Sequence, residues 1–215
     1  MDDAYARIRR IITLLEREYP HPDTALSYRT PFQLLVATIL SAQCTDARVN
    51  QITPGLFKKY PRVEDFARLS QKTLEQEIRS TGFYRNKAKY IVGAARSIVR
   101  DFKGKVPDTM EALRTLPGVA RKTANIVLSS AFKKAEGIAV DTHVRRLAGR
   151  LGLSACDDPN KIECDLMKIV PREKWISFNY LLVAHGRKIC QAKKPLHEQC
   201  VVKAYCPFYQ DIRRQ

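Results

Sequence analysis

Apolar residues recur at intervals of three and four along most of this 215-residue chain, the spacing of one face of an α-helix. The clearest case is segment 85–102, in which one apolar stripe lies opposite basic residues. That stripe comprises Ala88, Ile91, Val92, Ala95, Ile98 and Val99. No segment of useful length alternates apolar and polar residues as a half-buried strand does. We therefore predict an all-α fold.

Two further segments predict particular helices. Segment 31–43, PFQLLVATILSAQ, is apolar nearly all round and begins with Pro31, a residue that suits the first position of a helix. This composition predicts a helix buried in the middle of a bundle. Segment 108–115 opens with Asp108 three residues before Glu111, a spacing typical of a capping box.

The charge of the chain restricts its partners. Lysine and arginine number 38 against 22 acidic residues, a formal net charge of +16. Such an excess of positive charge indicates a polyanionic partner, with nucleic acid favoured over an anionic membrane surface. A basic surface that is merely solvated is the plainer alternative. The longest nearly apolar run, 34–40, is too short to span a bilayer. The N-terminal segment is unlike a signal peptide, so we expect an intracellular protein of the cytoplasm and nucleoid, with six cysteines as thiols or metal ligands.

A Pro-Gly turn, LPGVA (116–120), joins two predicted helices. Backbone N–H groups and a helix N-terminus meet at such a turn and can bind a phosphate. Lys122 follows in the first turn of the second helix, where the helix dipole favours a free, nucleophilic amine. Lys122 alone could equally be an ordinary surface lysine. Asp141, ahead of a later helix, could equally be an ordinary N-cap.

Five segments that occur in a fixed order favour the functional interpretation of Lys122 and Asp141. They are 34–50, 80–91, 116–125, 139–144 and the cysteine-rich tail. Together they resemble the endonuclease III family of helix-hairpin-helix DNA glycosylases, from about residue 8 to residue 206. The resemblance implies two helical domains: a six-helix barrel over 24–134 that carries the hairpin, and a discontinuous domain from 1–23 and 135–215. The second domain would end in an iron–sulfur cluster loop, 190–206.

The resemblance also implies a chemistry for two residues. The lysine at position 122 would attack C1′ of a damaged nucleotide and displace the base as a Schiff base, after which β-elimination cuts the strand 3′ to the site. Asp141 would activate the amine or stabilise positive charge on the sugar. An imine requires a primary amine, so Lys122 is the residue that argues for lyase activity.

The resemblance further implies the residues that bind DNA. Gln43 would fill the gap left by a flipped nucleotide, and Phe83 occupies the family's apolar wedge position. A packed Phe83 and a Gln43 that merely ends a helix are the alternatives. His143 is expected in the same cleft. The hairpin would contribute Leu116, Gly118, Ala120 and Arg121.

Ala120 departs from the family pattern, which commonly has a glycine at this position. A left-handed backbone there would cost an alanine about 1 kcal/mol. We expect the hairpin to tolerate the change.

The tail carries a second departure. Cys190, Cys200 and Cys206 match three ligand positions of the family's C-x6-C-x2-C-x5-C loop, and His197 stands at the remaining one. Imidazole ligates iron in Rieske centres. We therefore predict a [4Fe–4S] cluster with Cys3His ligation, with zinc or no metal as the alternatives.

These expectations combine into one function. We expect a bifunctional DNA N-glycosylase and AP lyase of base excision repair that removes oxidised pyrimidines from damaged double-stranded DNA as a monomer. One alternative is a mismatch-specific thymine or adenine glycosylase of the same fold. The other is a non-catalytic DNA-structure-binding protein that keeps the hairpin as a phosphate clamp.

Overall fold

The computed structural model describes residues 2–214, with side chains from Tyr5 onward. The described chain is mostly helical and contains no strand, so the all-α prediction is confirmed. It forms two compact units: a middle unit, Ala25–Lys134, and a terminal unit made of Met1–Thr24 and Ala135–Gln215. The first boundary lies one residue from the predicted one, and the second coincides with it.

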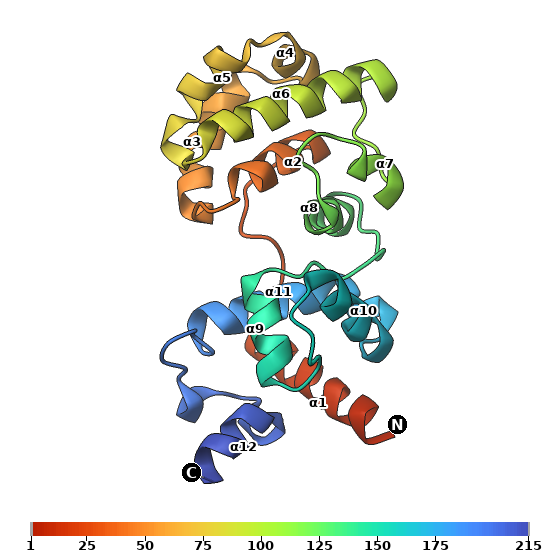
Figure 1. Ribbon diagram of the computed structural model, residues 1–215, viewed down its shortest axis with the longest axis vertical. Coiled ribbons are helices and arrows are strands. Elements are labelled where there is room, and N and C mark those ends of the chain that lie inside the picture. Colours follow the sequence, from red (N-terminus) through yellow and green to blue (C-terminus); the bar gives the residue numbers. More distant parts are fainter. Residues whose placement is uncertain (1, 215) are drawn as a thin grey trace. The chain divides into compact units, whose positions relative to one another are not determined.

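The middle unit consists of helices of different lengths and the turns that join them (Figure 1). Its elements are α2 (Pro31–Leu40), α3 (Asp46–Lys59), α4 (Val63–Arg68), α5 (Gln71–Glu77), a 3-10 turn (Arg79–Thr81), α6 (Tyr84–Asp101), α7 (Met110–Arg114) and α8 (Arg121–Ile126), which continues as a π-helical turn (Val127–Ala131).

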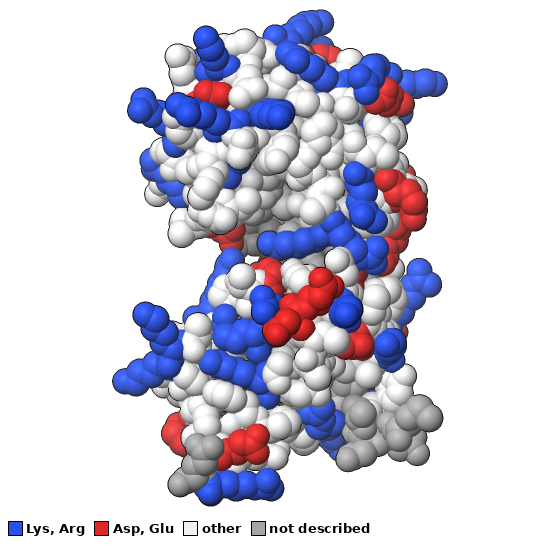
Figure 2. Space-filling view, viewed as in Figure 1, with Lys and Arg blue, Asp and Glu red and all other residues white. Residues whose placement is uncertain are grey.

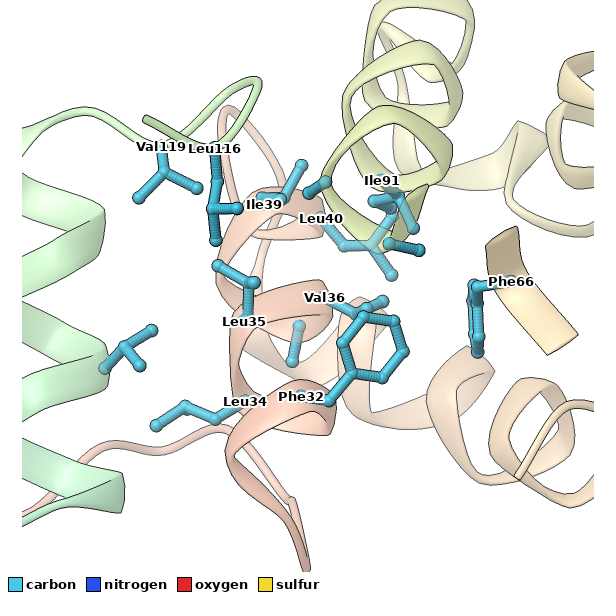
Figure 3. Packing of buried hydrophobic residues seen from close by; sticks show 14 of the residues in the cluster. Phe32, Leu34, Leu35, Val36, Ile39, Leu40, Phe66, Ile91, Leu116 and Val119 are labelled. Atoms are coloured by element: carbon cyan, nitrogen blue, oxygen red, sulfur yellow. The ribbon is translucent and has the colours of Figure 1, made fainter. Parts of the chain in front are cut away.

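Helix α2 is the central helix of that unit. Residues 34–40 are all buried, and the helix packs against α3, α6 and α8. The ring of Phe32 meets Phe66 of α4 edge-on, with ring centroids 5.2 Å apart. Leu116 and Val119, from the turn before α8, join the same core (Figure 3). The packing of α2 therefore also holds the hairpin turn in place.

The predicted helix over 31–43 is three residues too long. Helix α2 ends at Leu40, and a turn over 41–44 places Gln43 at φ +51°. The next helix, α3, begins immediately afterwards, capped by Thr45, whose side chain accepts a hydrogen bond from the N–H of Arg48 at 3.2 Å. Apolar periodicity alone did not reveal this break, because the capping threonine lies beyond the apolar stretch.

The predicted capping box at Asp108 is also wrong, by one residue. Helix α7 begins at Met110, and Thr109 is its N-cap, accepting from the N–H of Ala112 at 3.3 Å. The Asp108 carboxylate instead forms an ion pair with Lys134 Nζ at 2.6 Å. Lys134 also donates to the backbone carbonyl of Asp108.

The terminal unit is formed by two segments that are distant in sequence. Its elements are α1 (Asp2–Glu18), α9 (Thr142–Arg150), α10 (Pro159–Ile169), α11 (Trp175–Lys188) and α12 (Pro207–Arg214), with 3-10 turns at Arg172–Lys174, His197–Gln199 and Lys203–Tyr205. Helix α1 packs against α10 and α11, and α9 against α11. None of the helices in residues 2–214 has the length and apolarity that crossing a membrane needs.

The corrected cap of α7 leads to a stability prediction. Thr109→Ala removes the side-chain acceptor and should lower the free energy of unfolding by about 1 kcal/mol. Asp108→Ala removes an exposed ion pair and should cost less. Urea unfolding of both variants checks the order. A larger loss for Asp108→Ala would contradict the assignment of Thr109 as the cap.

Candidate functional site

The turn between α7 and α8 is held by its own backbone. The N–H of Leu116 donates to Leu113 O, and the N–H of Val119 donates to Leu116 O, each at 3.1 Å. Leu116 is 2% exposed and Val119 is 6% exposed, because both side chains enter the core of the middle unit. Any contact between Leu116 and DNA must therefore come from its backbone, and not from its side chain.

Gly118 is the residue of this turn with a left-handed backbone. Its φ is +76°, and a Cβ built there would lie 2.6 Å from Cβ and Cγ of Tyr90 on α6. Ala120, by contrast, has an extended backbone with φ −82° and ψ 169°. The cost considered for an alanine at position 120 therefore does not arise. The requirement for glycine lies two residues earlier.

Lys122 is the second residue of α8 and is exposed. Ala120, at the N-cap, has no side chain that could bond to the first turn of α8. The first N–H groups of a helix have no partner within the helix. The Lys122 amine therefore extends from a helix start at which the N-cap side chain does not cover the free backbone N–H groups. A phosphodiester can approach them.

Gln43 and Phe83 lie in two separate turns of the middle unit. Both have left-handed backbones, with φ of +51° and +47°, and Phe83 directly precedes α6. Such a backbone is uncommon for residues other than glycine and costs about 1–2 kcal/mol. The Phe83 side chain is 63% exposed. Phe83 is therefore not packed in the core, and Gln43 lies three residues beyond the end of α2. The role of either residue in binding DNA stays a prediction.

In the terminal unit, Asp141 caps α9. Its Oδ1 accepts from the N–H groups of His143 and Val144, both at 2.8 Å. The ordinary N-cap interpretation is thus correct for this carboxylate. The two bonds also fix the direction of the half-buried side chain, which a catalytic carboxylate needs.

His143 follows on the first turn of α9. Burial lowers its pKa, and the positive charges of Arg146 and Arg187 lower it further, while Asp141 acts in the opposite direction. Arg146 Nη2 lies 3.1 Å from His143 Nδ1. A guanidinium only donates, so this contact favours the tautomer whose Nδ1 accepts. The lowered pKa favours the neutral ring, while a hydrogen bond to the backbone of Gly186 acts in the opposite direction.

Lys122 belongs to the middle unit, whereas Asp141 and His143 belong to the terminal unit. Each residue is placed within its own unit as described above. That the amine and the carboxylate meet at one sugar stays a prediction.

The cysteine loop, residues 190–206, brings the four predicted ligands to one cavity. Cys190, His197, Cys200 and Cys206 all line it. Burial raises the pKa of the Cys200 thiol, and the neighbouring thiols of Cys190 and Cys206 raise it further. The His197 ring also lies beside Tyr209, with ring centroids 5.1 Å apart. Within residues 2–214, no three His, Cys, Asp or Glu side chains are grouped for a single metal ion.

Two arginines of α9, which the sequence analysis did not single out, support this loop. Arg146 donates to the carbonyls of Gly186 and Cys190 at 2.9 and 3.1 Å. Arg150 donates to the carbonyls of Gln191 and Ala192, both at 2.8 Å, and approaches Cys190 Sγ at 3.3 Å. Their four-residue spacing places both on one face of the helix. That spacing is the sequence signal by which the two arginines could have been found.

His185 is a buried histidine beside the loop. Its Nε2 lies 3.3 Å from Cys200 Sγ, and its Nδ1 lies 3.2 Å from Tyr19 Oη. Burial lowers the pKa of His185 to about 4. The ring is therefore neutral near pH 7 and connects α1 and α11 to the loop through two neutral contacts.

The surface of both units is basic. On the face drawn in Figure 2, lysine and arginine are prominent on the middle unit and on the terminal unit. This agrees with the net charge of +16. Positive charge of this extent supports binding to a polyanion such as the DNA backbone.

The hairpin geometry predicts opposite effects for two glycines. Gly118→Ala places a methyl group against Tyr90 on a left-handed backbone and should lower the free energy of unfolding by about 1–3 kcal/mol. Gly55→Ala lies within α3, where the added Cβ meets nothing within 4 Å, and should raise it by up to about 1 kcal/mol. Thermal unfolding of both variants measures these changes. Equal effects of the two substitutions would contradict the described turn.

Comparison with known proteins agrees with this geometry. The model of the HhH-GPD superfamily of base excision DNA repair proteins matches residues 36–172. Endonuclease III of Synechocystis sp. is 52% identical over 204 residues, which cover 95% of this chain and 93% of that protein. Endonuclease III of Escherichia coli is 36% identical over 207 residues, with 96% and 98% covered.

Solved structures give the same result. A trapped endonuclease III–DNA covalent intermediate matches with a TM-score of 0.92 and 40% identity, covering 98% of this chain and 99% of that one. A thermostable thymine-DNA glycosylase, 23% identical with a TM-score of 0.86 over 96% and 98% of the two chains, shares the fold. The predicted helix-hairpin-helix fold is confirmed. The chain therefore belongs to the endonuclease III family of the HhH-GPD superfamily and is a DNA glycosylase of base excision repair.

Proposed function

We propose that this protein is a bifunctional DNA N-glycosylase and AP lyase that removes oxidised pyrimidines from duplex DNA as a monomer. The observation that carries the proposal is the exposed amine of Lys122 in the first turn of α8, directly after the hairpin. The likeness to a trapped endonuclease III–DNA covalent intermediate supports a covalent route.

In the proposed reaction, Lys122 Nζ attacks C1′ of the damaged nucleotide. The C1′–N bond to the base breaks, and the base leaves with the bonding electron pair and takes up a proton. Opening of the sugar ring gives an imine between C1′ and Nζ. Loss of a proton from C2′ then expels the 3′ phosphate by β-elimination, and hydrolysis of the imine restores the amine.

Asp141 is proposed to act on the same sugar. Its carboxylate is held by two backbone N–H groups, so it can face a developing positive charge without reorganising. His143 would donate its Nε2–H to the nucleic acid. The hairpin backbone from Leu116 to Ala120, together with Arg121, would hold the phosphates that flank the lesion.

Base flipping is proposed to use the two left-handed turns of the middle unit. The exposed ring of Phe83 would enter the stack as a wedge, and Gln43 would occupy the space that the flipped nucleotide leaves. Each residue stands at a turn whose strained backbone directs a side chain outward. Strain of this kind is frequent at functional sites.

A mismatch-specific glycosylase of the same fold is the second candidate function. The likeness to a thymine-DNA glycosylase supports only the shared fold, because the identity is 23%. Lys122 favours the lyase, since a glycosylase that activates water does not need an amine there. The trapping experiment below separates the two activities.

The cysteine loop is proposed to hold a [4Fe–4S] cluster through Cys190, His197, Cys200 and Cys206. The four side chains line one cavity but are not grouped for a single ion. A four-iron cluster fits this arrangement better than zinc, because each ligand binds a different iron and not one central ion with bonds near 2.3 Å. Once bound, the cluster would cross-link the loop as a structural element.

Borohydride trapping tests the proposed lyase. The wild-type protein should form a covalent adduct with a thymine-glycol duplex, and Lys122→Gln should reduce adduct and strand cleavage by at least about a hundredfold. Lys72→Gln, at an exposed lysine of α5, is the matched control and should behave as wild type. Absence of a wild-type adduct would contradict the lyase, and release of thymine from a G·T mismatch duplex without an adduct would favour the mismatch glycosylase.

Substitution of His197 tests the proposed cluster. Protein purified without oxygen should contain about four irons per chain. His197→Cys should keep the iron and lower the reduction potential, because a thiolate adds negative charge that the neutral imidazole lacks. His197→Ala should reduce the iron content. Bound zinc, or a potential unchanged in His197→Cys, would contradict ligation of the cluster by His197.

A further inference from the structure

Lys87, on the first turn of α6, is a buried lysine to which the reaction assigns no part. It is 3% exposed, and burial lowers its pKa. A lysine is almost never buried unless its ammonium is paired. The partners of this ammonium are backbone carbonyls: Nζ donates to Leu40 O and to Thr81 O, each at 2.8 Å.

Both carbonyls stand at the ends of helical segments. Leu40 is the last residue of α2, and Thr81 is the last residue of the 3-10 turn Arg79–Thr81. The final carbonyls of a helix have no partner within it and carry its negative dipole end. One ammonium therefore satisfies the ends of two segments whose last residues, Leu40 and Thr81, are 41 positions apart in the sequence.

After each of these two carbonyls, the chain enters a turn that contains a residue with a left-handed backbone. Leu40 is followed three residues later by Gln43, and Thr81 is followed two residues later by Phe83. These are the residues at φ +51° and +47°. The backbone of Lys87 also contacts the second of these turns, because its N–H donates to Phe83 O at 3.1 Å.

We propose that Lys87 is a positioning residue for base flipping, and that its ammonium holds the turns bearing Gln43 and Phe83 in fixed register. The inference rests on the proposed role of Phe83 as the wedge. An insertion step needs side chains that are already oriented, because ordering them during binding would cost affinity. Lys87 orients the turns that carry these side chains from beneath the surface and touches no nucleotide.

A double-mutant cycle on the full chain tests this inference. The measured quantity is the affinity for a duplex containing tetrahydrofuran, an abasic-site analogue, divided by the affinity for the intact duplex at the same salt concentration. In the wild-type background, Phe83→Ala should lower this preference about tenfold. In the Lys87→Met background, Phe83→Ala should lower it less than about twofold, since the wedge is already displaced.

The matched controls separate positioning from stability. Lys72→Met removes an exposed lysine of α5 and should leave the full effect of Phe83→Ala. Lys87→Gln keeps a neutral N–H2 donor group and is the second background, used if Lys87→Met does not fold as judged by thermal unfolding. It should give an intermediate coupling. A merely structural lysine would lower the unfolding temperature without changing the effect of Phe83→Ala.

Two outcomes would overturn the inference, and they are distinguishable. If Phe83→Ala costs the same factor in the Lys87 variants as in the wild type, Lys87 does not position the wedge, and the proposed role of Phe83 stands. If Phe83→Ala has no effect in the wild type, the wedge assignment fails, and the role of Lys87 fails with it.

Discussion

Burial of α2 on every side is the constraint on which the middle unit depends. A helix that is apolar nearly all round must be covered by neighbours, and α3, α6 and α8 provide that cover. The same contacts determine where three turns begin. Gln43 follows the end of α2, Phe83 precedes α6, and the hairpin turn rests on the core through Leu116 and Val119. Placement of the residues proposed to bind DNA is thus a consequence of packing.

In each unit, cationic side chains hold a segment in place by donating hydrogen bonds to its backbone carbonyls. Lys87 binds the carbonyls of Leu40 and Thr81 in the middle unit. In the terminal unit, Arg146 and Arg150 bind carbonyls at the start of the cysteine loop. Backbone carbonyls are independent of side-chain identity, so such a clamp tolerates changes at the exposed residues it positions.

The sequence predicted the helices better than their ends, and it did not reveal the buried contacts that hold the turns. Periodicity revealed α6, and the Pro-Gly turn revealed the hairpin, because both leave a local pattern. The caps of α3 and α7 depended on single threonines beside equally suitable residues. The partners of Lys87 could not be derived from the sequence, because the carbonyl of Leu40 is contributed by a helix 47 residues away. Convergence of Lys122 and Asp141, which lie in different units, remains a prediction.

Peptide mapping of the reduced protein–DNA adduct shows whether the reaction begins at the amine of Lys122, in the helix that follows the hairpin. After borohydride reduction and nuclease digestion, trypsin cannot cut at a lysine that carries the sugar. We expect the sugar remnant on peptide 122–133, which begins after Arg121 and ends at Lys133, with fragmentation placing it on Lys122. A remnant on any other lysine, or on the N-terminal amine, would contradict Lys122 as the nucleophile.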